Sequence, residues 1–186
     1  MKKQSKFKKL IIPLFIVFIM VFSIFGYMAN RSDNSEKIEY NDYNFIKSDL
    51  GWITYKDDNP ILIQNNPSDL EEISDTQITI QDLNSAQKIY LTFNPEEDLY
   101  YALNSFTNQI TPLIGNFIQA CTKDVPKCSN LPLKTCSDAT DLINVIQIQE
   151  NSITNLEYTN NCLIIQGKGE NLTKAIDKLT LVLNGI

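Results

Sequence analysis

Residues 10–29 read LIIPLFIVFIMVFSIFGYMA and contain no charged side chain. At a rise of about 1.5 Å per residue, twenty helical residues span roughly 30 Å, which is the thickness of a bilayer core. We therefore expect a transmembrane helix at residues 10–29, with the lipid bilayer as the first partner of the chain.

The preceding residues 1–9, MKKQSKFKK, contain five lysines and no acidic residue. Lys and Arg are enriched on the cytoplasmic side of membrane helices, so we expect a cytoplasmic tail and a single-pass protein of the cell membrane. Everything after residue 29 would then be extracytoplasmic. A cleaved signal peptide is the alternative. Against it, the apolar run is longer than a usual h-region, and Tyr27 stands where a cleavage site ending at Ala29 would need a small residue.

Charge divides unevenly between the tail and the rest of the chain. The chain has 16 basic and 22 acidic residues, and five of the basic ones lie in the tail. The remainder therefore carries a net charge of −11. This balance argues against nucleic acid as a partner of the extracytoplasmic part.

All four cysteines, Cys121, Cys128, Cys136 and Cys162, lie in the predicted extracytoplasmic part. An even number in an oxidising compartment indicates two disulfides. The spacings do not fit a structural zinc site, the chain has no histidine, and no C-x-x-C motif is present. Of three possible connectivities we favour Cys121–Cys128, which brackets a short loop, with Cys136–Cys162, which a hairpin-like pairing of the following strands would bring together. Spacing alone does not exclude the crossed pairings.

Residues 30–42 are polar and predict a juxtamembrane linker, followed by a folded domain at 43–186. The runs YNFIK, GWITYK and PILIQ, separated by turn residues, predict a three-stranded β-meander. PSDLEEI is typical of a short helix that starts near Pro67. QITIQ alternates strictly and predicts a half-buried strand, and KIYLTF predicts a central strand.

The strongest helix pattern begins at Asn94, where Asn94, Pro95 and Glu97 resemble a capped helix start. Its apolar stripe comprises Leu99, Leu103, Phe106, Ile110, Leu113, Phe117 and Cys121. Pro112 and Gly115 should kink or split this helix. LINVIQIQ, SITNLEY and CLIIQG predict three further strands, and a second apolar stripe predicts a C-terminal helix that ends before Gly185. The fold class predicted is α+β, with the helices covering one face of a sheet.

The residue types exclude several chemistries. Without histidine, Ser-His-Asp and Cys-His mechanisms cannot operate within this chain. The GKG at residues 167–169 lacks the frame of a phosphate-binding loop. The carboxylate pairs Asp57–Asp58, Glu71–Glu72 and Glu96–Glu97 are typical of turns or helix starts. We therefore assign no catalytic, cofactor-binding or metal-binding residue.

Two sequons, Asn30-Arg-Ser and Asn171-Leu-Thr, make Asn30 and Asn171 candidate glycosylation sites.

The segments ACTKDVPKC and NNCLIIQGKGENLTKAIDKLTLVLNGI carry a resemblance. With the YNFIK, GWITY and NPSDLEEI runs, they are similar to a family of small membrane-anchored archaeal proteins. In that family an aspartate lies in the final helix, and here it is Asp177. The resemblance implies paired cysteines that face outward and an archaeal cell envelope, and it implies no activity.

These observations predict a membrane-anchored extracytoplasmic binding or assembly protein, such as an accessory subunit of a cell-envelope complex. Its partner would be an envelope protein, a peptide or a glycan. The alternative is a carboxylate-based envelope hydrolase, or a domain whose active site a partner completes. Buried carboxylates that converge in a deep cleft would favour the enzyme, whereas an exposed apolar patch would favour the binding module.

Overall fold

The computed structural model describes residues 15–20, 22–23, 36–74 and 76–186. The chain divides into two units, Met1–Ser35 and Glu36–Ile186. In the first unit, residues 15–20 and 22–23 are helical and their side chains are exposed. Within the described residues, no helix is both long enough and apolar enough to cross a membrane. The predicted tail at 1–9, most of the predicted span at 10–29, and Asn30 lie outside the described residues.

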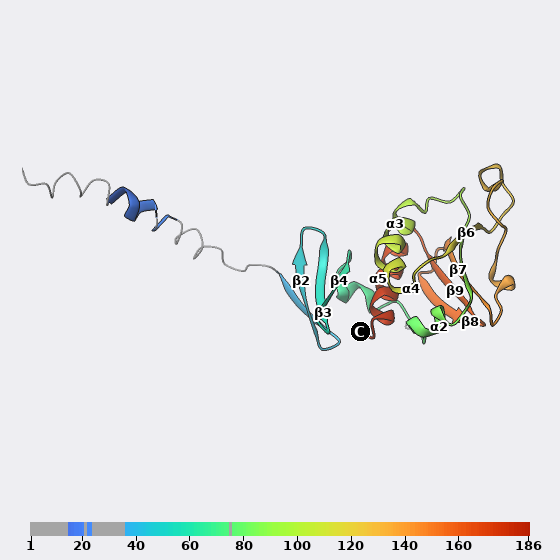
Figure 1. Cartoon of the computed structure of the whole chain (residues 1–186), viewed down its shortest axis with the longest axis horizontal. Coiled ribbons are helices and arrows are strands. Elements are labelled where there is room, and N and C mark those ends of the chain that lie inside the picture. The colour runs from blue at the N-terminus through green and yellow to red at the C-terminus, as the bar shows by residue number, and fades with distance from the viewer. Residues whose placement is uncertain (1–14, 21, 24–35, 75) are drawn as a thin grey trace, which may run out of the picture. The chain divides into compact units, whose positions relative to one another are not determined.

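The second unit begins with an antiparallel four-stranded sheet, which we call the meander (Figure 1). Its strands, in spatial as well as sequence order, are β1 (Lys37–Tyr40), β2 (Tyr43–Ser48), β3 (Gly51–Lys56) and β4 (Asn59–Ile63). Two-residue turns at Asn41–Asp42 and Asp57–Asp58 close two of its hairpins. All four of these turn residues have positive φ, as type I′ turns require, and Asn and Asp tolerate that conformation well.

A second sheet of five strands follows, in the order β6-β5-β7-β9-β8. Its strands are β5 (Lys88–Phe93), β6 (Ile118–Cys121), β7 (Ile143–Glu150), β8 (Asn155–Thr159) and β9 (Cys162–Gly167). Neighbouring strands are parallel except for β8, which pairs antiparallel with β9 at one edge. The predicted α+β class with disulfides is confirmed, and it is built on two sheets rather than one.

Helix α5 (Glu170–Leu183) lies between the two sheets, as Figure 1 shows. It packs on β9 and on α3 (Tyr100–Gln109), and Lys178 on its other side donates a hydrogen bond to the hydroxyl of Tyr40 in β1. Ten of its fourteen residues are buried. One continuous apolar core therefore includes Phe45 and Ile63 from the meander together with residues of α5 and the second sheet.

The helix predicted from Asn94 onward is shorter than expected and is split. It begins only at Tyr100, and α4 (Thr111–Ile114) follows directly after α3, so the predicted split at Pro112 and Gly115 is confirmed. Gly115 has φ +73 and ends α4, after which the chain becomes the strand β6. The prediction that the helix continues to Cys121 is therefore wrong.

PSDLEEI forms the short 3-10 helix η1 (Pro67–Leu70), which confirms a short helix starting at Pro67 and is shorter than the predicted run. Two other predictions are wrong. QITIQ is not a strand, because Thr79 and Asp82 form a capping box that starts the short helix α2 (Ile80–Asn84). In addition, β1 lies inside the segment predicted as a linker at 30–42, where Tyr40 is buried in the core.

Cysteine bridges join Cys121 to Cys128 and Cys136 to Cys162, the pairing that the sequence favoured, with Cα–Cα distances of 6.1 and 5.3 Å. The prediction that a hairpin-like pairing of strands brings Cys136 and Cys162 together is wrong, because β7 and β9 are parallel. The loop between the bridges runs beside the edge of β6, where the Cys121 N–H donates to the Pro132 carbonyl and the Lys134 N–H donates to the Cys121 carbonyl. The loop thus pairs with an edge strand that would otherwise be open.

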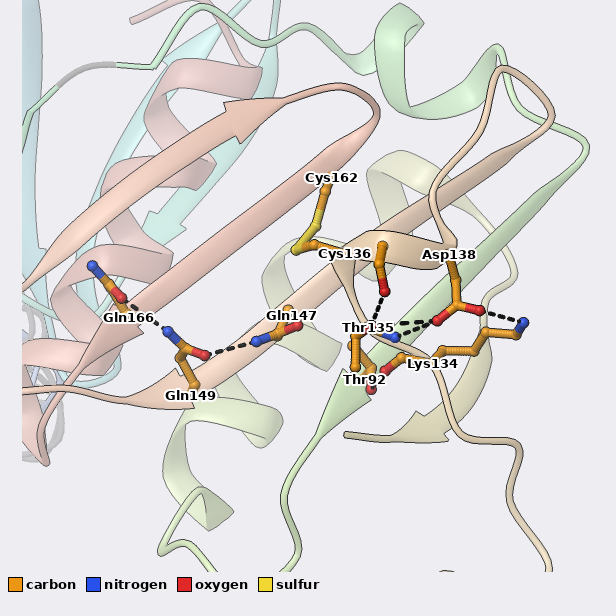
Figure 2. Close-up of a disulfide and its surroundings, with 10 residues drawn as sticks. Thr92, Lys134, Thr135, Cys136, Asp138, Gln147, Gln149, Cys162 and Gln166 are labelled. Carbon is orange, nitrogen blue, oxygen red and sulfur yellow. Dashed lines mark hydrogen bonds and ion pairs between the residues drawn. A yellow bond between two sulfur atoms is a disulfide. The ribbon is translucent and has the colours of Figure 1, made fainter. Parts of the chain in front are cut away.

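The loop also covers part of the helix-free face of the second sheet (Figure 2). The Thr92 hydroxyl donates to the Lys134 carbonyl at 2.6 Å, and the Lys134 ammonium lies 5.5 Å from the ring centre of Tyr90. The Asp138 carboxylate accepts from the backbone N–H of Thr135 and from the Lys134 ammonium, and these hydrogen bonds hold the pKa of Asp138 below its ordinary value. The cysteine-rich segment is therefore a structural cover stapled to the sheet at both ends.

Replacing both cysteines of the second bridge, in Cys136→Ala with Cys162→Ala, should lower the free energy of unfolding by about 3.5 kcal/mol. The same exchange at Cys121 and Cys128 should remove about 2.5 kcal/mol through its shorter loop, plus a packing term because Cys121 is fully buried. Urea denaturation with and without reductant measures both effects. A reductant that leaves the wild-type midpoint unchanged would contradict the bonds.

Candidate functional site

Asp177, in the middle of α5, is fully buried and accepts four hydrogen bonds. Its Oδ2 accepts from the backbone N–H of Gln64 at 3.0 Å, and from the backbone N–H and the side-chain amide of Asn65, both at 2.7 Å. Its Oδ1 accepts from the side-chain amide of Gln109 at 2.8 Å. One carboxylate therefore joins the end of β4, the end of α3 and the centre of α5.

The network extends from Gln109 to Thr180, one turn further along α5. The Thr180 hydroxyl lies 2.7 Å from the side-chain oxygen of Gln109 and 2.9 Å from the Ile176 carbonyl oxygen, so its single proton can be donated to either oxygen. The donors around Asp177 match the acceptor-only character of an ionised carboxylate. Removing the carboxylate would leave two backbone N–H groups without their acceptor, which costs more than the net gain of making the bonds.

Burial raises the pKa of Asp177 above its ordinary value, although the hydrogen bonds from Asn65, Gln109 and Gln64 act in the opposite direction. The folded protein therefore binds this proton more tightly than the unfolded chain does. The contribution of Asp177 to stability is then greatest below the ordinary carboxyl pKa, and it falls as pH rises toward the folded-state pKa.

A groove of about 450 Å³ lies beside this network. One wall is β4, with Pro60 and Leu62, together with Gln64 just after it, and the other is formed by the end of α3 and by α4. Thr180 of α5 and Asn184 just after that helix also line the groove, and no Asp, Glu, Lys or Arg belongs to its described lining. The groove is thus uncharged, and two of its lining residues, Gln64 and Gln109, are held by the Asp177 carboxylate.

The outer face of the meander carries an apolar row on β2, β3 and β4, although a solvated face of an antiparallel sheet is normally polar. At the edge of this row, Lys37 of β1 stands opposite Ile46. Ile46, Ile53 and Leu62 stand directly opposite one another across β2, β3 and β4. Around this row lie Tyr55, 60% exposed, and Leu50, 75% exposed. We call Ile46, Leu50, Ile53, Tyr55, Pro60 and Leu62 the meander surface. It is continuous with the groove, because Leu50, Pro60 and Leu62 also line the groove.

The carboxylate pairs do not converge. Asp57–Asp58 forms a hairpin turn, and Glu71–Glu72 follows η1. Glu97, predicted as part of a helix start, instead accepts from the backbone N–H of Glu150 and the side chain of Asn94, so it caps the end of β7. Asp177 is the one buried carboxylate among the described residues.

The helix-free face of the second sheet carries a row of amides, which Figure 2 shows beside the Cys136–Cys162 bridge. The Gln147 side chain donates to Gln149 at 2.7 Å, and Gln149 donates to Gln166 at 3.0 Å. These side chains satisfy one another on a partly exposed face. We interpret the row as a polar, solvated surface.

The remaining candidates from the sequence are a glycosylation sequon, the GKG turn and possible metal ligands. Asn171 is exposed in the first turn of α5, whereas Leu172 and Thr173 of its sequon are buried. Gly167 and Gly169 form the turn before that helix, and Gly169 takes φ +57. In the described part of the chain, no group of three or more His, Cys, Asp or Glu side chains could hold a metal ion.

Sequence reasoning reached Asp177 only through the family resemblance and missed the groove and the meander surface. A signal for the surface was present: Phe45–Ile46, Trp52–Ile53 and Ile61–Leu62–Ile63 are consecutive apolar residues in strands. Adjacent strand residues point to opposite faces, so these runs place apolar side chains on both sides of the meander.

With this geometry established, the chain was compared with known proteins. No protein-family model, no curated protein and no solved structure matches it.

Asp177→Ala should lower the free energy of unfolding by about 3 kcal/mol, because it leaves the backbone N–H groups of Gln64 and Asn65 buried without a hydrogen-bond acceptor. Asp177→Asn should cost about 1–2 kcal/mol, since its amide oxygen can still accept from both groups. Glu157→Gln, at an exposed position on β8, is the control and should change stability by less than about 0.5 kcal/mol.

The wild type and Asp177→Asn should also differ in how their free energy of unfolding depends on pH. As the pH rises above the ordinary carboxyl pKa, the wild type should lose stability relative to Asp177→Asn, which has no carboxyl group to titrate. Urea unfolding at a series of pH values measures the difference. A difference that stays constant or grows with pH would contradict the raised pKa.

Proposed function

We propose that this chain is a membrane-anchored extracytoplasmic binding or assembly protein, such as an accessory subunit of a cell-envelope complex. The observation that carries the proposal is the meander surface, which continues into an uncharged groove. Contiguous exposed apolar surface on a folded domain marks sites of interaction. The partner contacts this surface and the groove together.

The proposed setting is supported by three features of the chain. The two disulfides are typical of proteins in an oxidising compartment. The run at residues 10–29 has the length and composition of a membrane anchor, and the lysine-rich tail favours a cytoplasmic N-terminus. The resemblance of the C-terminal segments to small membrane-anchored archaeal proteins fits the same setting.

The rival proposal, a carboxylate-based hydrolase, has less support. Hydrolysis by two carboxylates needs both groups at one cleft, a few ångströms apart, with room for substrate or water. The buried carboxylate Asp177 already accepts four hydrogen bonds from the protein itself. The pairs Asp57–Asp58 and Glu71–Glu72 are exposed on separate turns, and Glu97 of the third pair is already hydrogen-bonded to Glu150 and Asn94.

The orientation predicts how protease attacks the protein in cells. Protease added to intact spheroplasts or right-side-out vesicles should degrade the domain after residue 36 and leave an N-terminal fragment in the membrane. A cytoplasmic protein serves as the control for intactness. Digestion of the domain only after lysis would contradict the extracytoplasmic location.

The meander surface predicts where a partner is cross-linked. A photoreactive benzoylphenylalanine at Tyr55, irradiated in intact cells, should give a discrete species of higher mass. Ile53→Glu, which places a charge in the centre of the apolar row, should abolish it. Ser152→Glu, which adds the same charge to an exposed turn before β8, should not.

Two results would contradict binding at the meander surface. Ile153, 67% exposed beside β8, is the comparison site for the photoreactive residue. If cross-links formed there and not at Tyr55, or if Ile53→Glu left the Tyr55 cross-link unchanged while folding normally, assembly would use another surface.

A further inference from the structure

The free edge of β4 presents unpaired backbone groups to the groove. In an antiparallel pair, residues alternate between those that bond the partner strand and those whose N–H and C=O face away. The two-residue turn at Asp57–Asp58 makes Lys56 and Asn59 a bonded pair. By alternation Ile61 and Ile63 also bond β3, and Pro60 and Leu62 face away.

Three observations agree with this alternation. Pro60 has no N–H, so it suits a position that faces away from β3. A β-carbon at Gly51 of β3 would collide with the carbonyl oxygen of Ile63, which shows that this carbonyl points toward β3. Gln64 continues the outward series, and its N–H donates to Asp177 on the side away from β3.

The outward groups of β4 are therefore the Pro60 carbonyl and the N–H and carbonyl of Leu62, all beside the groove. An edge that offers alternating acceptors and donors is the template for adding an extended strand. The opposite wall of the groove is formed by Asn108, Pro112 and Leu113, so an added strand would lie between this wall and the edge of β4.

We infer that the groove binds an extended peptide segment with uncharged side chains, which adds to the meander beside β4 through the N–H and carbonyl of Leu62. The inference rests on the proposed function and names the kind of partner that its binding surface takes. An uncharged occupant fits because the described lining holds amides, a hydroxyl and apolar side chains and no charge.

Two features limit the added strand to a short segment. Pro60 has no N–H to donate, and the N–H of Gln64 is already bound by Asp177. On this edge the peptide can therefore accept a backbone hydrogen bond only from the Leu62 N–H, and it can donate only to the carbonyls of Pro60 and Leu62. The same two features protect the edge from open-ended pairing with other copies of the chain, which free edge strands otherwise invite.

The test uses a display library of short linear peptides, selected against the full chain in detergent and then resynthesised. We expect enriched peptides to be uncharged and extended. Leu62→Pro removes the N–H that faces the groove and should weaken binding about tenfold. Leu62→Ala keeps the N–H and should weaken binding by clearly less. Ser152→Pro, in the exposed turn before β8, is the control and should leave binding unchanged.

A second measurement keeps the test valid if Leu62→Pro fails to fold. In the wild type, saturating peptide should slow hydrogen exchange of the Leu62 amide at least tenfold, and it should leave the amides of β8 unchanged. Slowed Leu62 exchange together with the larger effect of proline supports strand addition.

The other outcomes overturn the inference in distinguishable ways. Peptides that bind without protecting the Leu62 amide, and lose more affinity with Leu62→Ala than with Leu62→Pro, would show side-chain binding in the groove. The proposed function would then survive without strand addition. If no peptide is enriched, or only charged ones are, the peptide partner is wrong, and the cross-link from Tyr55 still decides the proposed function separately.

Discussion

The Asp177 carboxylate is the interaction on which the arrangement of this domain depends. A helix buried between two sheets has no solvent to satisfy a charged side chain, so a carboxylate there must find its donors within the protein. Asp177 finds them at the end of β4 and the end of α3, the two elements that form the walls of the groove. The same bonds that solvate the charge thus connect the elements that form the two walls of the groove.

Successive residues of β4 and the two residues after it serve either the core of the domain or the groove. Ile61 and Ile63 of β4 point into the core, Gln64 and Asn65 after the strand are bound to Asp177, and Leu62 faces the groove and the meander surface. At the other sheet, the cysteine-rich loop occupies the backbone groups at the edge of β6 and so covers that edge. One edge of the molecule is therefore closed by a stapled loop, and another remains partly open beside an apolar surface.

Elements with a strong local pattern could be predicted from the sequence. The strands β2 to β4, β7, β8 and β9 and the apolar stripe of α5 each agree with a period that the local residues determine. The errors occur where a local signal competes with a longer pattern. Thr79 and Asp82 cap a helix inside an alternating run, and Gly115 ends a helical stripe whose spacing continues to Cys121 by coincidence.

The candidate site was less predictable for a physical reason. The groove combines β4, α3, α4 and α5, which are more than a hundred residues apart at their extremes, and no local pattern encodes their meeting. Asp177 looked like one acidic residue on a helix face, because its partners Gln64, Asn65 and Gln109 are ordinary polar residues elsewhere in the chain. The consecutive apolar residues of the meander strands, such as Trp52–Ile53, were the one sequence pattern that indicated the meander surface.

The most direct test of the account is residue-resolved amide hydrogen exchange of the free protein across β4 and the residues after it. The account predicts slow exchange at Ile61 and Ile63, which bond β3, and at Gln64 and Asn65, which bond Asp177. Between them, the Leu62 amide should exchange at least tenfold faster. A Leu62 amide as protected as its neighbours, or unprotected amides at Gln64 and Asn65, would contradict the free edge and the Asp177 anchor, respectively.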